Sequence, residues 1–188
     1  LFHKYPPTLP DDDVSADIQQ EGQKLLEQSG YPQYEVSAYA QANSQCRHNR
    51  NYWEFGDYIG IGAGAHGKIS SYTPEGSLSI VRYQKPRQPE LYLEKALLGK
   101  ARIHITPLVS EQLGFEFMLN ALRLKQGFPL PLFAERTGAP ITLIQNELNH
   151  AQTQGLIDLT PDWVKPTEQG WQFLNNAIEL FLPADLTD

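Results

Sequence analysis

Cysteine is nearly absent from this sequence: the 188 residues contain a single one, Cys46. One thiol cannot form an internal disulfide, which favours a reducing compartment. It also cannot hold an iron–sulfur cluster, because such a cluster needs several thiolates. We therefore expect Cys46 to be an inert thiol.

The sequence also lacks long apolar runs and a targeting signal segment at its amino terminus. No segment approaches the ~20 apolar residues of a membrane-spanning helix, and no basic segment followed by an apolar one opens the chain. With 40% hydrophobic residues the chain can still bury a core, so we expect a cytoplasmic globular protein. It begins with Leu1, and its one methionine is Met118. We expect the carboxy-terminal part of a larger protein, with a trimmed complete domain as the alternative.

Positive charge is scarce as well. The net charge of −7 disfavours binding to nucleic acid or to an anionic membrane. Residues 67–102 are the exception, with seven Lys and Arg against three Asp and Glu, a net charge of +4. This basic segment suits an anionic ligand such as a carboxylate, or it is an ordinary surface.

The first half of the chain predicts a mixture of helices and strands. Three acidic residues, Asp11 to Asp13, precede an apolar-periodic run and predict a helix over 12–29 that ends at Gly30. A helix followed directly by a strand is typical of the end of an α/β layer. Alternation and β-prone composition predict strands over 34–39, 58–65 and 77–84, and a short helix is expected over 90–98.

The last eighty residues predict a different architecture. Helices are expected over 110–125, 129–137 and 140–153, then a hairpin of 156–159 with 163–165, and a final helix from Thr167 to Phe181. This order is the outline of a winged-helix domain. The third helix contains no Lys or Arg, so it lacks the groups that contact DNA phosphates, and we expect a packing or partner-binding role instead.

A glycine-rich segment is the first candidate site. Gly62, Gly64 and Gly67 satisfy G-x-G-x-x-G, but the dinucleotide fingerprint requires a helix directly after the glycines. The following residues 68–72 do not predict one, and no Gly-Lys-Ser/Thr of a P-loop is present. Two interpretations remain: a strand that lets a flat ligand approach closely, or close backbone packing alone.

The second candidate site is the segment His48–Trp53. Imidazole can ligate iron, and Tyr52 and Trp53 can stack on a planar ligand, while the Asn49 amide can orient one. A packed core histidine beside aromatic residues is the alternative. The other histidines considered, His3, His104 and His150, have no partners at metal-ligand spacing.

Three segments together carry a family resemblance: residues 34–40 (YEVSAYA), 46–53 (CRHNRNYW) and 57–67 (DYIGIGAGAHG), in this order and spacing. The chain resembles the HemW group of heme chaperones, which are radical-SAM proteins long labelled oxygen-independent coproporphyrinogen III oxidase-like. The H-N-x-x-Y-W element is the most specific part, because it separates the chaperone-like group from true coproporphyrinogen oxidases.

The resemblance implies an α+β or α/β fold with three segments. Residues 1–66 would hold the last helix and strand of an incomplete (β/α) radical-SAM barrel and the cofactor-pocket segment. Residues 67–104 would form a β and linker region, and 105–188 a winged-helix-like HemN C-terminal-type domain. The parent protein would carry a C-x-x-x-C-x-x-C loop for a [4Fe-4S] cluster completed by S-adenosylmethionine. That loop is not in this chain.

The resemblance also implies site residues and partners. His48, Asn49, Tyr52 and Trp53 would contact heme, with His48 as a possible iron ligand and Cys46 and His66 as other candidates nearby. A second set, Gly62, Ala65 and His66, would lie on the S-adenosylmethionine side. The expected partners are heme or a porphyrin, a heme-acceptor protein and the amino-terminal barrel.

The leading hypothesis for function is heme binding and transfer. Radical decarboxylation of coproporphyrinogen III and a non-catalytic interaction module are the alternatives. Without the cluster cysteines, we expect no catalysis from these residues alone.

Overall fold

The computed structural model describes residues 7–183 and divides the chain into two compact α+β units, one ending at Cys46 and one beginning at Arg47. The boundaries expected after residues 66 and 104 lie within β3 (His66–Tyr72) and β5 (Ile103–Pro107) of the second unit. No helix within residues 7–183 combines the length and the apolar composition that crossing a membrane requires. His3 lies outside the described residues.

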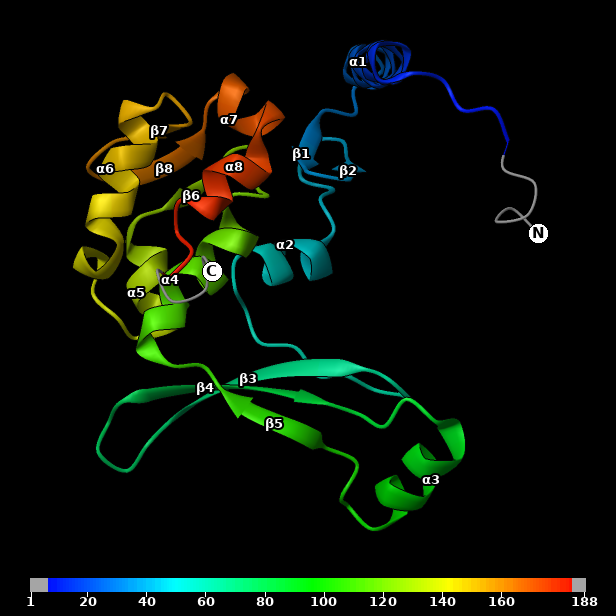
Figure 1. Cartoon of the computed structure of the whole chain (residues 1–188), viewed down its shortest axis with the longest axis vertical. Helices are drawn as coiled ribbons and strands as arrows, with labels where there is room; N and C mark the ends of the chain where they lie inside the picture. The colour runs from blue at the N-terminus through cyan, green and yellow to red at the C-terminus, as the bar shows by residue number, and fades with distance from the viewer. Residues whose placement is uncertain (1–6, 184–188) are drawn as a thin grey trace. The chain divides into compact units, whose positions relative to one another are not determined.

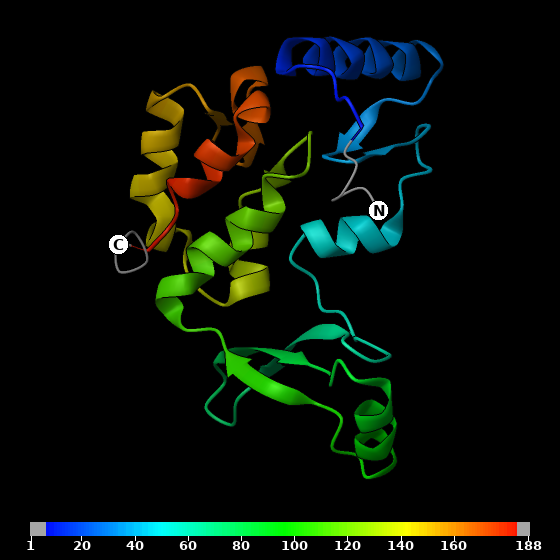
Figure 2. The same ribbon diagram turned by 45° about the vertical axis from the view of Figure 1, so that its right-hand side comes forward.

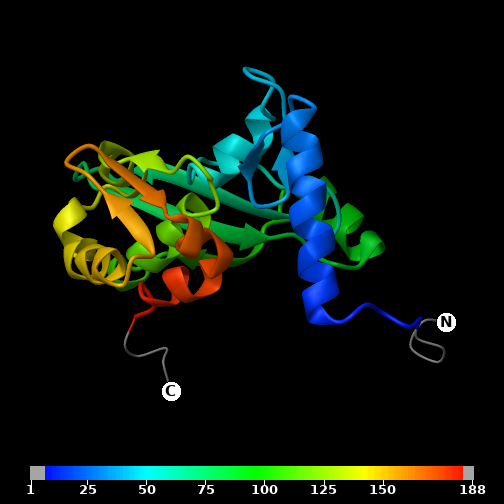
Figure 3. The ribbon, with the colours of Figure 1, turned by 90° about the horizontal axis from the view of Figure 1, so that it is seen from above.

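The first unit opens with the predicted helix, α1 (Asp12–Gln28). The Asp11 carboxylate accepts a hydrogen bond from the Val14 N–H at 2.8 Å and so caps the helix. At the other end, Gly30 has a φ of +83° and its N–H donates to the Glu27 carbonyl, as expected of a helix-terminating glycine. Figure 3 shows the full length of this helix.

The single strand predicted over 34–39 is wrong. These residues form a tight antiparallel hairpin of β1 (Gln33–Glu35) and β2 (Ala38–Tyr39). Its turn is held by the Glu35 carboxylate, which accepts hydrogen bonds from the N–H and hydroxyl of Ser37 at 3.0 and 3.2 Å. A carboxylate that satisfies the turn in this way reverses the chain where the alternation predicts extension.

The second unit begins with a short helix and a three-stranded antiparallel sheet. Its elements are α2 (Arg47–Trp53), β3 (His66–Tyr72), β4 (Leu78–Gln84), α3 (Pro89–Leu97) and β5 (Ile103–Pro107), and the strand order is β3-β4-β5. In Figure 1 the three strands lie side by side, with α3 in the connection from β4 to β5.

The strand predicted over 58–65 is also wrong. Only Tyr58 pairs with the sheet, through an isolated bridge to Lys68. Gly62 and Gly64 have φ values of +102° and +73°, so the chain turns here and the strand starts at His66. The predicted strand over 77–84 and the helix over 90–98 are confirmed within one residue at each end, as β4 and α3.

The remainder of the second unit contains the predicted helices and hairpin. Its elements are α4 (Ser110–Ala121), β6 (Phe128–Pro129), α5 (Pro131–Thr137), the 3₁₀ helix η1 (Ile141–Ile144), α6 (Gln145–Thr153), β7 (Ile157–Leu159), β8 (Trp163–Pro166), α7 (Glu168–Gln172) and α8 (Leu174–Glu179). The hairpin gains β6 as a third strand, in the order β6-β8-β7. The final helix is not continuous, because Phe173 leaves helical geometry with ψ at +45°.

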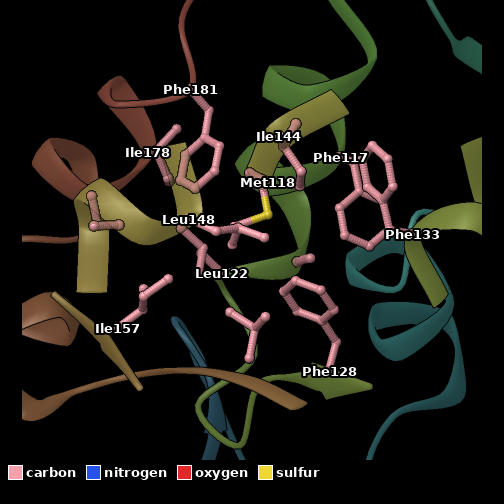
Figure 4. Close-up of a cluster of buried hydrophobic side chains, with 14 of the residues drawn as sticks. Phe117, Met118, Leu122, Phe128, Phe133, Ile144, Leu148, Ile157, Ile178 and Phe181 are labelled. Atoms are coloured by element: carbon pink, nitrogen blue, oxygen red, sulfur yellow. The ribbon is translucent and has the colours of Figure 1, made fainter. Parts of the chain in front are cut away.

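One core joins the sheet to the helices. Phe117 of α4 is fully buried and meets Phe55, Phe128 and Phe133 edge-on, with ring centroids 5.1–5.7 Å apart. Figure 4 shows the Phe117, Phe128 and Phe133 rings in one cluster with apolar side chains from α4, α6 and α8. Phe55 follows α2 and Ile80 comes from β4, so this core holds both α2 and the sheet against α4. The candidate sites on α2 and β3 therefore rest on a rigid base.

Candidate functional site

The residues of the second candidate site lie on a helix that the sequence pattern did not predict. Within α2, His48 and Tyr52 are four residues apart and share one face, while Asn49 and Trp53 share the neighbouring face. Arg50 and Glu54 form an ion pair across the same spacing. His48 is exposed, whereas Asn49, Tyr52 and Trp53 are half-buried. Figure 2 shows α2 and the loop that leads from it to β3.

Tyr52 is the centre of a small aromatic group. Its ring meets Trp53 edge-on at 5.1 Å and lies 5.0 Å from Tyr58, at an angle of 46°. The Arg123 guanidinium lies over the Trp53 ring, 5.4 Å from its centroid. The indole N–H of Trp53 is buried and has no hydrogen-bond partner among residues 7–183. Such an orphaned donor is uncommon and marks a position to explain.

A groove of about 480 Å³ lies next to this aromatic group, within the size range of ligand pockets. Of the predicted site residues, Tyr52 and His66 line it, whereas His48, Asn49, Trp53, Gly62 and Ala65 do not. The structure therefore brings one residue of each predicted set to a common surface. The complete lining is Tyr52, Tyr58, His66, Gly67, Arg82, Tyr83, Gln84, His104, Thr106, Leu108, Gln112 and Glu116.

His104 is the residue that the sequence reasoning missed. It comes from β5 and lines the same groove as His66, although the two are far apart in the sequence. Spacing could not reveal this, because the two strands that carry them are connected through β4 and α3. The signal is three-dimensional: His66 pairs with Gln84 of β4, and Gln84 pairs with Ile103, directly before His104.

The glycine loop lies beside this groove. The Gly62 N–H donates to the Tyr92 hydroxyl at 3.2 Å, and the Gly64 N–H donates to the Pro86 carbonyl at 2.8 Å. These bonds tie the loop to α3 and to the end of β4. At Gly67 an added Cβ would lie 2.2 Å from the Tyr83 ring, whereas at Gly62 nothing lies within 4 Å. Close packing thus explains Gly67, and open space at Gly62 leaves room for a ligand.

An ion pair between Lys68 and Asp57 lies near the site. Lys68 is 2% exposed, pairs with Asp57 at 3.1 Å and lies 4.2 Å from the centroid of the Phe55 ring. Burial lowers the pKa of Lys68. Burial would raise the pKa of Asp57, but hydrogen bonds from Ser70 and the Lys68 ammonium outweigh it and hold that pKa below its usual value.

Two further groups on the groove have shifted pKa values. Burial raises the pKa of Tyr58 to about 12, with a further contribution from Tyr52, so Tyr58 is a protonated donor at neutral pH. Burial also raises the pKa of Glu116, although the Arg82 guanidinium forms an ion pair with it. The groove therefore offers imidazole, phenol and amide groups together with one paired cation.

Comparison with known proteins shows the family of this chain. Residues 108–173 match the HemN C-terminal domain family. The heme chaperone HemW of Escherichia coli is 43% identical over 182 residues, which cover 97% of this chain. The chain is a HemW homologue. The HemW of Haemophilus influenzae is 42% identical over the same share, and the mitochondrial radical S-adenosyl methionine domain-containing protein 1 of Bos taurus is 32% identical over 90% of the chain.

Two comparisons set the extent of this homology. The chain spans less than half the length of these relatives, 46% of the Escherichia coli HemW and 39% of the Bos taurus protein. The structure described as coproporphyrinogen III oxidase (HemN) from Escherichia coli, a radical SAM enzyme, matches 95% of the HemW homologue with a TM-score of 0.64. This chain covers 43% of the HemN structure, at 17% sequence identity. The likeness establishes the fold.

Proposed function

We propose that this chain is the heme-handling part of a HemW-type chaperone that binds heme and passes it to an acceptor protein. The observation that carries this proposal is the 43% identity to a heme chaperone over 97% of the chain. The 182 aligned residues extend well beyond the HemN C-terminal domain at 108–173.

The chemistry of α2 supports the proposal. His48 presents an exposed imidazole one turn before Tyr52, and neutral imidazole is the usual protein ligand of heme iron. Tyr52 offers a ring at the groove for a planar macrocycle. Trp53 packs edge-on against Tyr52 and so supports the position of that ring. Asn49, on the same face as Trp53, would orient the ligand.

A second ligand is proposed on the glycine loop. Gly62, Ala65 and His66 would approach S-adenosylmethionine, and the open space beside Gly62 suits that role. The [4Fe-4S] cluster needs at least three thiolates, and this chain has one cysteine. The cluster would therefore be held by a region outside these residues, and we expect no catalysis from the chain alone.

The architecture fits the same proposal. Residues 1–66 would hold the last helix and strand of a radical-SAM barrel and the cofactor-pocket segment, and the apolar side of α1 is exposed here at Val14, Ile18 and Leu25. The part from α4 to α8, with its three-stranded sheet, would be a winged-helix-like domain that covers the barrel. We propose a cytoplasmic location. We also propose no nucleic-acid partner, because α6 carries no Lys or Arg.

The test is a heme titration of the full-length gene product, with and without its cluster and S-adenosylmethionine. We expect stoichiometric heme binding with a Soret band, a weaker affinity in His48→Ala, and no change in His150→Ala, which alters an exposed histidine on α6. Absence of heme binding contradicts the proposal. Anaerobic conversion of coproporphyrinogen III would instead support the oxidase alternative, and no response to either ligand would support a pure interaction module.

A further inference from the structure

The backbone at His104 is unusual. His104 has a φ of +47°, in the left-handed region that few residues other than glycine occupy, with asparagine, aspartate and histidine the most frequent of them. Non-glycine residues in this region cost free energy, and they cluster at functional sites where the surrounding structure enforces them. A histidine held there needs a physical reason.

The reason is a β-bulge in β5. Arg82 pairs with Thr106 and Gln84 pairs with Ile103, so β5 advances three residues where β4 advances two. The extra residue lies between Ile103 and Thr106, where His104 has the positive φ. Bulges redirect side chains and are frequent beside active sites. Here the bulge accompanies an imidazole that lines the groove and remains exposed to solvent.

The groove has one sheet face as its base. In a sheet, residues paired across strands point to the same side, and so do residues two apart on one strand. His66, Gln84 and Arg82 therefore share a face with Thr106, and all four line the groove. His104 adds a second imidazole to the lining, which also includes the Tyr52 and Tyr58 rings from α2 and the following loop.

The donor set selects the kind of ligand. A bare transition-metal site needs three or four protein ligands, and residues 7–183 contain no cluster of three His, Cys, Asp or Glu side chains that could hold an ion. Heme iron already has four pyrrole nitrogens and needs only one or two axial ligands from the protein. Two imidazoles beside aromatic rings thus fit a metalloporphyrin and do not fit a free cation.

We infer that the groove binds heme and that His104 is an axial ligand of its iron. The inference rests on the proposed function and deepens it, since it names a ligand on β5 that lies outside the α2 motif. Tyr52 and Tyr58 contact the macrocycle, and Arg82 is positioned for a propionate in exchange with Glu116. His66 is a second imidazole that lines the same groove.

The experiment compares variants of the full-length gene product loaded with ferric heme, by visible absorption and electron paramagnetic resonance. His104→Asn is the main variant, because asparagine accepts a positive φ and so keeps the bulge but cannot replace the imidazole. His104→Gly repeats the test with the residue that best tolerates this backbone. His150→Ala is the matched control.

We expect His104→Asn and His104→Gly to lose the low-spin signature and about tenfold or more of heme affinity. Added free imidazole should restore the low-spin spectrum in both variants, and His150→Ala should behave as wild type. Unchanged spectra and affinity in both variants would overturn the inference while leaving the proposed function intact. If wild-type protein binds no heme, the proposed function and the inference both fail.

Discussion

The ion pair between buried Lys68 and exposed Asp57 yields the sharpest stability prediction. Lys68 is 2% exposed, whereas its partner Asp57 is 42% exposed, so the two ends of one interaction have different surroundings. Replacing Asp57 by asparagine keeps the shape and the ability to accept the Ser70 N–H at 2.7 Å, but leaves Lys68 buried without a counter-charge. The Arg82 guanidinium further destabilises the charged form of Lys68, because the two positive charges repel each other.

The expected magnitude follows from this asymmetry. Removing one partner of a fully buried pair costs about 3–5 kcal/mol, and the partial exposure of Asp57 reduces this, because an exposed pair contributes only about 0–1 kcal/mol. We expect Asp57→Asn to lower the free energy of unfolding by about 2 kcal/mol. Lys68→Met removes the buried charge and fills its place with an apolar chain, so it should cost about 1 kcal/mol or less.

Urea unfolding followed by tryptophan fluorescence measures these differences. All three tryptophans, Trp53, Trp163 and Trp171, lie in the second unit, so the signal reports the part that contains the pair. The double variant Asp57→Asn/Lys68→Met should be more stable than Asp57→Asn alone. If Lys68→Met is as destabilising as Asp57→Asn, or if the two changes simply add, the reasoning about an uncompensated buried charge is wrong.

Three further outcomes are expected. Gly67→Ala should destabilise the protein by about 2 kcal/mol or more, measured by thermal unfolding, because the added methyl group would overlap the Tyr83 ring; wild-type stability would contradict the close approach. In a spectrophotometric tyrosine titration, one group should ionise near pH 12 and disappear in Tyr58→Phe; a variant that keeps this group would contradict the assignment to Tyr58. Glu116→Gln should tighten heme binding a few-fold by releasing Arg82 from its ion pair, and weaker binding would contradict a propionate contact.

The sequence predicted the elements whose signals are local. Acidic residues before an apolar-periodic run located α1, and Gly30 located its end, because capping depends on residues a few positions apart. Helices α4, α5 and α6 followed from periodicity and from their proline and glycine boundaries. The absence of a helix after Gly67 was also predicted correctly, and β3 occupies that place.

Features that depend on distant partners were predicted wrongly or missed. The turn at Ser37 exists because the Glu35 carboxylate closes it, and alternation alone could not distinguish this hairpin from one strand. The bulge at His104 depends on the register between β4 and β5, which no property of either strand encodes separately. The groove unites α2, the sheet and α4 through the common core, so its second imidazole appears only once the chain is folded.

The packing around Gly60 connects the two proposed ligands. The Gly60 N–H donates to the Tyr83 hydroxyl at 3.2 Å, and an added Cβ at Gly60 would lie 2.1 Å from the His66 carbonyl oxygen. Because Gly60 packs closely against the backbone of His66, we expect a displacement of the glycine loop to move His66, which lines the groove. A ligand beside Gly62 and a heme in the groove would therefore act on the same short segment. If both proposals hold, binding on the loop side changes heme affinity through His66, and linkage requires heme to change the affinity on the loop side by the same factor.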